Sequence, residues 1–155
     1  MTEKLRNDEH FNEYLMNIKS TDVLVIDKIY MLSSKLFIQI EYICRKVREN
    51  YLYFGGIQVI GWGDFFQLPP VPDTYKFDFG EFCFKAEIVH SVFRHKVVLK
   101  KVMRQDEPDF VCAINNVSKG FHPDETLNLL RRLQRPLPPG EDTITLFGGN
   151  FEKEM

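Results

Sequence analysis

The stretch from residue 22 to residue 71, which opens with DVLVIDKIYML and closes with GDFFQLPPV, decides the fold of this chain. Residues 23–26 form an unbroken run of β-branched and apolar side chains that ends in Asp27. Such runs are typical of strands buried on both faces of a parallel sheet. Residues 57–62 form a second run of this kind, and Asp64 follows it closely.

The segment between the two runs predicts a helix. Ser33 or Ser34 can cap a helix that spans about residues 34–49, and the pair Gly55-Gly56 predicts a turn after it. The apolar residues of this helix predict one buried stripe, made of Leu36, Ile40, Ile43 and Val47. Strand, helix and strand in this order predict an α/β domain with a mostly parallel sheet flanked by helices. Ligands of such sheets bind beyond the carboxyl ends of the strands.

Weaker patterns predict the remaining elements. The proline-rich residues 69–72 cannot continue a regular element, and the aromatic residues 73–85 predict an irregular segment. Spacing and composition predict further helices at 8–19, 107–118 and 124–133, and further strands at 96–99 and 143–147.

Composition excludes several classes of protein. The chain has 155 residues, which fits one domain, and a net charge of −2, which excludes a molecule that binds nucleic acid through its global charge. Three separated cysteines without a CxxC pair argue against a disulfide framework and a zinc site. No run approaches the ~18 apolar residues of a membrane helix, and the charged N-terminus does not have the pattern of a secretory signal. We therefore expect neither a membrane segment nor a signal peptide.

Asp27 is the first candidate for chemistry. An apolar strand that ends in aspartate is the Walker B arrangement, in which the carboxylate holds Mg²⁺ against nucleotide phosphates. Aspartate also favours turns, so a plain turn at the end of a strand explains this residue equally well on its own.

The loop of residues 63–71 is the second candidate. Asp64 stands at a strand end and Gln67 follows three residues later, where an uncharged amide can orient a water or contact a γ-phosphate. The prolines after Gln67 stiffen the loop. The alternative is a tight turn followed by a proline-rich connection.

Together the two segments resemble the Pif (petite integration frequency) family of DNA helicases. The motifs that carry the resemblance are TDVLVIDKIYML, FGGIQ and GDFFQLPPV, in this order and at this spacing. It continues more weakly through residues 102–106 and Arg135-Pro136, and it extends over most of the chain from about residue 10 onward.

The resemblance implies an ATP-dependent helicase that moves 5′ to 3′ on single-stranded DNA or DNA junctions, with roles in DNA repair, recombination and telomere maintenance. It implies two RecA-like domains of the P-loop NTPase type, and it implies that residues 1–155 are the later part of the first, without its Walker A segment or the second domain. ATP and Mg²⁺ would be the cofactors. Asp27 would bind the metal, Gln67 with Asp64 would sense the γ-phosphate, and Arg104 would reach the phosphates as an arginine finger does. For Arg104 the alternative is a surface salt bridge. Location in the nucleus, or in mitochondria, follows from the family.

Two departures limit what this chain does by itself. The phosphate-binding pattern GxxxxGK[ST] does not occur in the sequence, because no glycine precedes a lysine. Lys28 stands where the family has a glutamate that activates water, and a lysine with an ordinary pKa of about 10.4 is a cation and no base. Tyr30 stands where the family has serine. We therefore expect the isolated chain to be inactive; the alternative is a non-catalytic remnant that binds single-stranded DNA or a protein.

The helix 34–49 and the FGGIQ turn match the signature segment of the family, and the resemblance implies that they support the DNA-binding side. Phe65 and Phe66 are the best candidates for stacking on bases, whereas we expect most of the other aromatic side chains between residues 54 and 84 to lie in the core. Basic side chains that could contact phosphates are Lys35, Arg45, Lys46 and Arg48. A solvated helix face, which also carries Glu41 and Glu49, is the alternative for this set.

Overall fold

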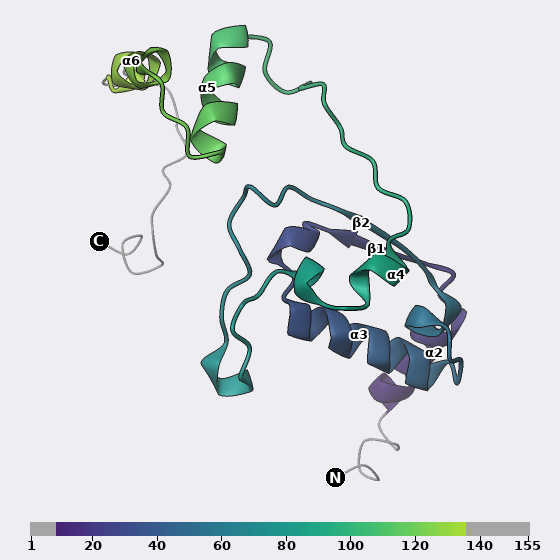
Figure 1. Cartoon of the computed structure of the whole chain (residues 1–155). Helices are drawn as coiled ribbons and strands as arrows, with labels where there is room; N and C mark the ends of the chain where they lie inside the picture. The colour runs from purple at the N-terminus through teal and green to yellow at the C-terminus, as the bar shows by residue number, and fades with distance from the viewer. Residues whose placement is uncertain (1–8, 136–155) are drawn as a thin grey trace. The chain divides into compact units, whose positions relative to one another are not determined.

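The computed structural model describes residues 9–135, and these fall into two compact units (Figure 1). The first unit ends at Lys101 and the second begins at Val102, so each is described by itself. The predicted strand at residues 143–147 lies outside the described residues. No helix among residues 9–135 has the length and apolar character that crossing a bilayer requires.

A parallel pair of strands forms the centre of the first unit. Strand β1 (Val23–Asp27) pairs with β2 (Gln58–Trp62) in a register that joins Val23 to Gln58 and Asp27 to Trp62. Helix α3 (Ser34–Val47) makes the crossover between them, as parallel strands require. Helix α2 (Glu9–Ser20) precedes β1. The prediction of strand, helix and strand is therefore confirmed.

Helix α3 begins where the sequence predicts, but its buried face differs from the prediction. Ser33 is the cap, because its Oγ accepts a hydrogen bond from the Leu36 amide at 3.1 Å. The predicted apolar stripe is wrong for half of its members: Ile40 packs against the core and Val47 is partly buried, but Leu36 and Ile43 are 44% and 49% exposed. The buried side chains are Phe37, Glu41 and Cys44.

An aromatic cluster explains this rotation of the helix. The Phe37 ring lies 5.4 Å from Phe54 and 5.9 Å from Phe93, measured between ring centres. Phe37 and Phe54 are completely buried. An aromatic ring removes more apolar area from water than an aliphatic side chain does, so Phe37 decides which face turns inward.

Two cysteines complete this core. Cys44 and Cys83 are buried free thiols, and burial raises the pKa of each. They pack with Ala86 and Val89, which lie on or beside a one-turn segment, η4 (Cys83–Lys85), and the short helix α4 (Val89–Val92).

Arg48, at the C-terminal cap of α3, binds main-chain carbonyls on two other segments. Its Nη1 donates to the carbonyl oxygens of Ile18, Lys19 and Thr21 at 3.1, 2.9 and 2.7 Å, and its Nε donates to the Gly55 carbonyl at 2.8 Å. Carbonyls at the end of a helix have no partner within the helix and carry partial negative charge, which favours a cation there. We refer to this set of bonds as the Arg48 clasp.

The clasp depends on glycine in the turn before β2. Gly55 lies in the turn η2 (Tyr53–Gly56) with φ of +62°. A Cβ atom at this position would lie 2.8 Å from the Cys44 carbonyl oxygen and 2.9 Å from the Arg48 side chain. Both the backbone angle and the close approach therefore require glycine.

One face of the sheet is uncovered by the described residues of the first unit. Leu24, Ile26 and Val59 pack against the core. The alternate residues face the other side, where Val25 is 49% and Ile60 is 42% exposed. The prediction that β1 is buried on both faces is therefore wrong. Burial of both faces requires a layer on each, and the first unit supplies only one.

The predicted strand at residues 96–99 is also wrong. These residues have no regular structure. Val97, Val98 and Leu99 are 85%, 78% and 91% exposed. An apolar run becomes a strand only when another strand takes its backbone hydrogen bonds, and among residues 9–135 the sheet consists of β1 and β2.

The second unit is a pair of helices. Helices α5 (Pro108–Ser118) and α6 (Asp124–Leu133) confirm the two predicted helices. Asn116 donates to the Thr126 hydroxyl at 3.0 Å, and Ala113 and Thr126 are buried.

Replacing Arg48 by lysine should test the clasp. The change Arg48→Lys keeps the charge but removes the planar fork that reaches several carbonyls. We expect the free energy of unfolding to fall by about 2–3 kcal/mol in urea titrations followed by circular dichroism, because charge-assisted hydrogen bonds are lost. Arg94→Lys makes the same change at an exposed side chain and should cost less than ~0.5 kcal/mol. Equal losses in the two variants would contradict the clasp.

A matched pair of substitutions should separate the two faces of the sheet. Ile26→Thr places a hydroxyl on the covered face and should lower the free energy of unfolding by about 2 kcal/mol. Ile60→Thr makes the same change on the uncovered face and should lower it by less than ~0.5 kcal/mol. Urea titrations measure both. Similar costs would mean that the second face is covered in solution.

Candidate functional site

The carboxyl ends of β1 and β2 bring two predicted site residues to one edge of the sheet. Asp27 is the last residue of β1 and pairs in register with Trp62, the last residue of β2. Asp64 follows Trp62 by two residues, and both carboxylates are exposed. Parallel strands end at the same edge, so the predicted placement of Asp27 and Asp64 is confirmed.

Lys28 lies directly beside this edge. It adopts a left-handed backbone conformation (φ 51°, ψ 45°) and starts the one-turn segment η1 (Ile29–Met31). Non-glycine residues adopt this conformation at a cost of roughly 1–2 kcal/mol. The Lys28 side chain is exposed, so its ammonium group is available to anions at the edge.

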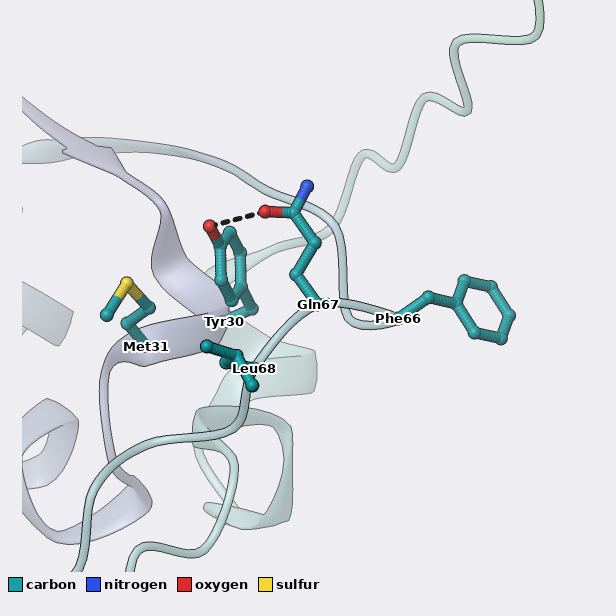
Figure 2. A pocket seen from close by; sticks show the side chains of 5 residues that line it. All are labelled: Tyr30, Met31, Phe66, Gln67 and Leu68. Atoms are coloured by element: carbon teal, nitrogen blue, oxygen red, sulfur yellow. Dashed lines mark hydrogen bonds between the residues drawn. The ribbon is translucent and has the colours of Figure 1, made fainter. Parts of the chain in front are cut away.

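Gln67 is held by residues from both strand ends. The buried Tyr30 of η1 donates its hydroxyl hydrogen to Gln67 Oε1 at 2.8 Å (Figure 2). Gln67 Nε2 lies 3.4 Å from Asp64 Oδ2. Asp64 also accepts the Phe66 amide on its side chain at 3.0 Å and the Gln67 amide on its carbonyl at 3.0 Å, which closes a tight turn.

Sequence reasoning did not identify the contact of Tyr30. The only signal was its presence at a position where the resembling family has serine. The ring lies against Gly63, because a Cβ atom on Gly63 would be 2.7 Å from Tyr30 Cδ1 and 3.2 Å from the Ile29 amide nitrogen. The glycine before Asp64 is therefore required by the tyrosine ring.

A shallow hollow lies at this point. It has a volume of about 350 Å³ and is lined by Tyr30, Met31, Phe66, Gln67 and Leu68. In Figure 2 the Gln67 side chain points toward Tyr30, whereas the Phe66 ring points away from it. The lining of the hollow is thus mainly apolar, and the Gln67 amide is oriented within it by its bond to Tyr30.

The two phenylalanines predicted to stack on bases differ in their surroundings. Phe65 packs edge to face against Phe82 and Phe84, with ring centres 5.8 and 5.1 Å apart. Phe66 is 64% exposed. Of the pair, Phe66 is therefore the more accessible to a base.

The expectation that most other aromatic side chains lie in the core is wrong. Tyr75, Phe77 and Phe79 are 97%, 77% and 81% exposed, although Phe54 is buried. Tyr75 and Phe77 lie in a short loop closed by main-chain hydrogen bonds between Asp73 and Asp78, and Phe79 directly follows it.

Most of the basic residues on α3 are occupied by contacts within the chain. Arg48 forms the clasp, and Arg45 Nε lies 3.0 Å from Glu41 Oε1 in an ion pair with this buried carboxylate. Lys35 donates to the carbonyl oxygens of Lys76 and Phe77.

The fourth basic residue of the set, Lys46, is exposed, with its Nζ 5.5 Å from the centre of the Tyr42 ring. A DNA-binding role for these side chains stays a prediction, and Lys46 is the member whose charge is most accessible.

Arg104 belongs to the second unit and is exposed. Its role at the phosphates therefore stays a prediction.

The chemistry of the edge fits magnesium only in part. Mg²⁺ is held by one or two carboxylates together with phosphate oxygens and waters. Asp27 offers one exposed carboxylate of the right kind. Within residues 9–135 no three histidine, cysteine, aspartate or glutamate side chains gather into a metal site. A metal at Asp27 would thus depend on phosphate oxygens and water for its remaining ligands.

A glycine substitution should test the contact between Tyr30 and the loop. Gly63→Ala should lower the free energy of unfolding by about 1–3 kcal/mol, because the new methyl group collides with the tyrosine ring. In a Tyr30→Ser background the same change should cost less, since the ring is gone. Urea titrations of the four variants form a double-mutant cycle. Additive costs would contradict the packing.

Comparison with known proteins places the chain in a family. Residues 2–125 match the family model described as PIF1-like helicase. The ATP-dependent DNA helicase PIF1 of Emericella nidulans is 39% identical over 117 residues, which are 76% of this chain and 16% of that protein. The helicase RRM3 of Saccharomyces cerevisiae is 35% identical over 117 residues, again 76% of this chain and 16% of that protein. The chain therefore spans less than a fifth of the length of these relatives.

Solved structures agree with this assignment. The crystal structure of Pif1 helicase from Candida albicans matches with a TM-score of 0.84 and 29% identity, over 97% of this chain and 34% of that chain. Pif1 helicase from Bacteroides, in complex with ADP-AlF3 and ssDNA, matches with a TM-score of 0.72 and 33% identity, over 86% of this chain and 32% of that chain. The parallel strands with their crossover helix are thus part of a RecA-like fold, and the chain belongs to the PIF1-like helicase family.

Proposed function

We propose that this chain is a segment of an ATP-dependent DNA helicase that unwinds DNA in the 5′ to 3′ direction, and that it forms the later part of the first RecA-like domain. The observation that carries the proposal is the convergence of Asp27, Asp64 and Gln67 at the carboxyl edge of β1 and β2. This edge is where α/β sheets bind their ligands.

ATP with Mg²⁺ is the proposed cofactor pair. Asp27 would contribute a carboxylate to the metal and Gln67 would donate a hydrogen bond to the γ-phosphate, with Arg104 as the arginine that reaches the phosphates. The Bacteroides relative was crystallised with ADP-AlF3, which supports use of a nucleotide by this fold. Bound Mg²⁺ would stabilise negative charge on the phosphates.

Single-stranded DNA or a DNA junction is the proposed partner. Bacteroides Pif1 is described bound to ssDNA, and two coordinating Pif1 helicases are described in DNA unwinding at forked dsDNA, which supports this choice. Phe66 and Lys46 are the accessible candidates for base stacking and phosphate contact. Work on DNA repair, recombination and telomeres, in the nucleus or in mitochondria, follows from the same proposal.

Lys28 changes what the edge does in this chain. An ammonium group beside Asp27 attracts phosphate but cannot take a proton from water at neutral pH. The edge is therefore suited to holding phosphates and poorly suited to hydrolysing them. The same observation favours a second function, a non-catalytic module that binds single-stranded DNA.

Measurement of DNA-stimulated ATP hydrolysis should decide between a helicase segment and a non-catalytic module that binds single-stranded DNA. The unmodified chain should show no turnover. A version with Lys28→Glu, joined to an upstream GxxxxGK[ST] segment, should hydrolyse ATP about 10²–10⁴-fold faster than the same fusion with Lys28 retained, because a base is restored.

Two control variants separate the effect of a restored base from the effect of a removed positive charge. Lys28→Gln in the fusion removes the positive charge without supplying a base, so it should stay slow. Asp27→Asn in the Lys28→Glu fusion should abolish the gain. Turnover by the unmodified chain would contradict the proposed loss of hydrolysis, and DNA binding with no turnover in the repaired fusion would favour the non-catalytic module.

A further inference from the structure

One hydrogen bond, from the Tyr30 hydroxyl to the Gln67 side chain, connects the segment after β1 with the loop after β2. Tyr30 lies in η1, directly after β1, and is only 6% exposed. Its hydrogen bond reaches Gln67, 37 residues later, in the loop after β2. The ring is held against Gly63, so the hydroxyl has little freedom to move.

The neighbours of Gln67 decide which end of its amide faces which way. A carboxylate accepts hydrogen bonds and cannot donate them, so the end near Asp64 Oδ2 must be the NH₂ group. The carbonyl end then faces Tyr30, and the tyrosine must donate. A tyrosine hydroxyl can donate or accept, so Asp64 selects the orientation of the amide and the Tyr30 hydroxyl then holds its carbonyl end in place.

This orientation has a chemical consequence. Nε2 carries two hydrogens, and one of them is directed at Asp64 over a long 3.4 Å contact. The other is left to donate outward. Phosphate oxygens are acceptors, so only the observed orientation of the amide recognises a phosphoryl group.

We propose that Tyr30 is a positioning residue that holds the Gln67 amide as a hydrogen-bond donor toward a phosphoryl group. This inference rests on the proposed function for the identity of the ligand, but not for the positioning itself. Tyr30 also makes η1 and the 64–67 turn into one unit, so that Asp27 and Gln67 keep a fixed relation. Preorganised donors cost no reorganisation when a charged group arrives.

The positioning can be measured without any ligand. In the ¹⁵N-labelled full chain, relaxation of the Gln67 side-chain NH₂ group, assigned by its disappearance in Gln67→Glu, reports its mobility. Tyr30→Phe keeps the ring against Gly63 and removes only the hydroxyl. We expect the Gln67 NH₂ to become as mobile as that of the exposed Gln39. Tyr51→Phe, at a tyrosine that is 96% exposed, should change nothing.

The outcome of this measurement is decisive. An unchanged Gln67 NH₂ mobility in Tyr30→Phe would overturn the positioning role, and so would an equal change in Tyr51→Phe. Backbone spectra of Tyr30→Phe outside η1 and residues 63–68 should match those of the unmodified chain, which separates loss of the bond from loss of the fold.

A second measurement tests the ligand. The chain joined to the upstream GxxxxGK[ST] segment is titrated with magnesium and either ADP or ADP–aluminium fluoride. Binding of ADP–aluminium fluoride should be about 3- to 10-fold weaker in the fusion that carries Tyr30→Phe, because one hydrogen bond loses its orientation. Binding of ADP should change less than ~2-fold, because ADP has no γ-phosphoryl group. Equal changes for both ligands would overturn the proposed direction toward that group. If neither ligand binds the fusion with Tyr30 retained, the proposed nucleotide function fails, while the relaxation result still decides the positioning.

Discussion

The bonds from the Arg48 guanidinium to carbonyl oxygens occur just before both strands begin. Thr21 precedes β1 by two residues and Gly55 precedes β2 by three, so one side chain ties together the starts of the two strands. The Gln58 amide then binds the Asp22 carbonyl at 3.0 Å, at the first step of the ladder. A slip of one residue at this end would move Asp27 relative to Trp62 and turn each affected side chain to the opposite face. The geometry of the candidate site therefore depends on a contact at the far end of the sheet.

The order of elements in this region was predictable because each element has a local cause. Apolar runs, a serine cap and a glycine turn indicate β1, α3 and β2 without knowledge of the rest of the molecule. The errors concern properties that depend on tertiary partners. The face of α3 that turns inward is decided by Phe54 and Phe93, which lie outside the helix. The run at residues 96–99 has strand composition, but within the described residues it has no strand to pair with.

In the candidate site, too, features with a local cause were predictable and features that depend on tertiary contacts were not. The shared edge of Asp27 and Asp64 was predictable, because parallel strands place their carboxyl ends together. The bond between Tyr30 and Gln67 was not, since it joins residues far apart in sequence and departs from the resembling family at position 30. The contacts that the basic residues of α3 make within the chain could not be predicted from the sequence either. Arg48 carries the charge of a phosphate-binding residue, but its donors are directed at the main chain.

The uncovered face of β1 and β2 has a consequence for the life of the polypeptide in a cell. Val25, Ile60 and Trp62 form part of an apolar surface on a two-stranded sheet, and no described segment of the first unit lies over it. Chaperones and quality-control proteases act on chains that present apolar surface and unpaired strand edges. Unless another polypeptide segment covers that face, the steady-state amount of this chain would be governed by degradation more than by synthesis.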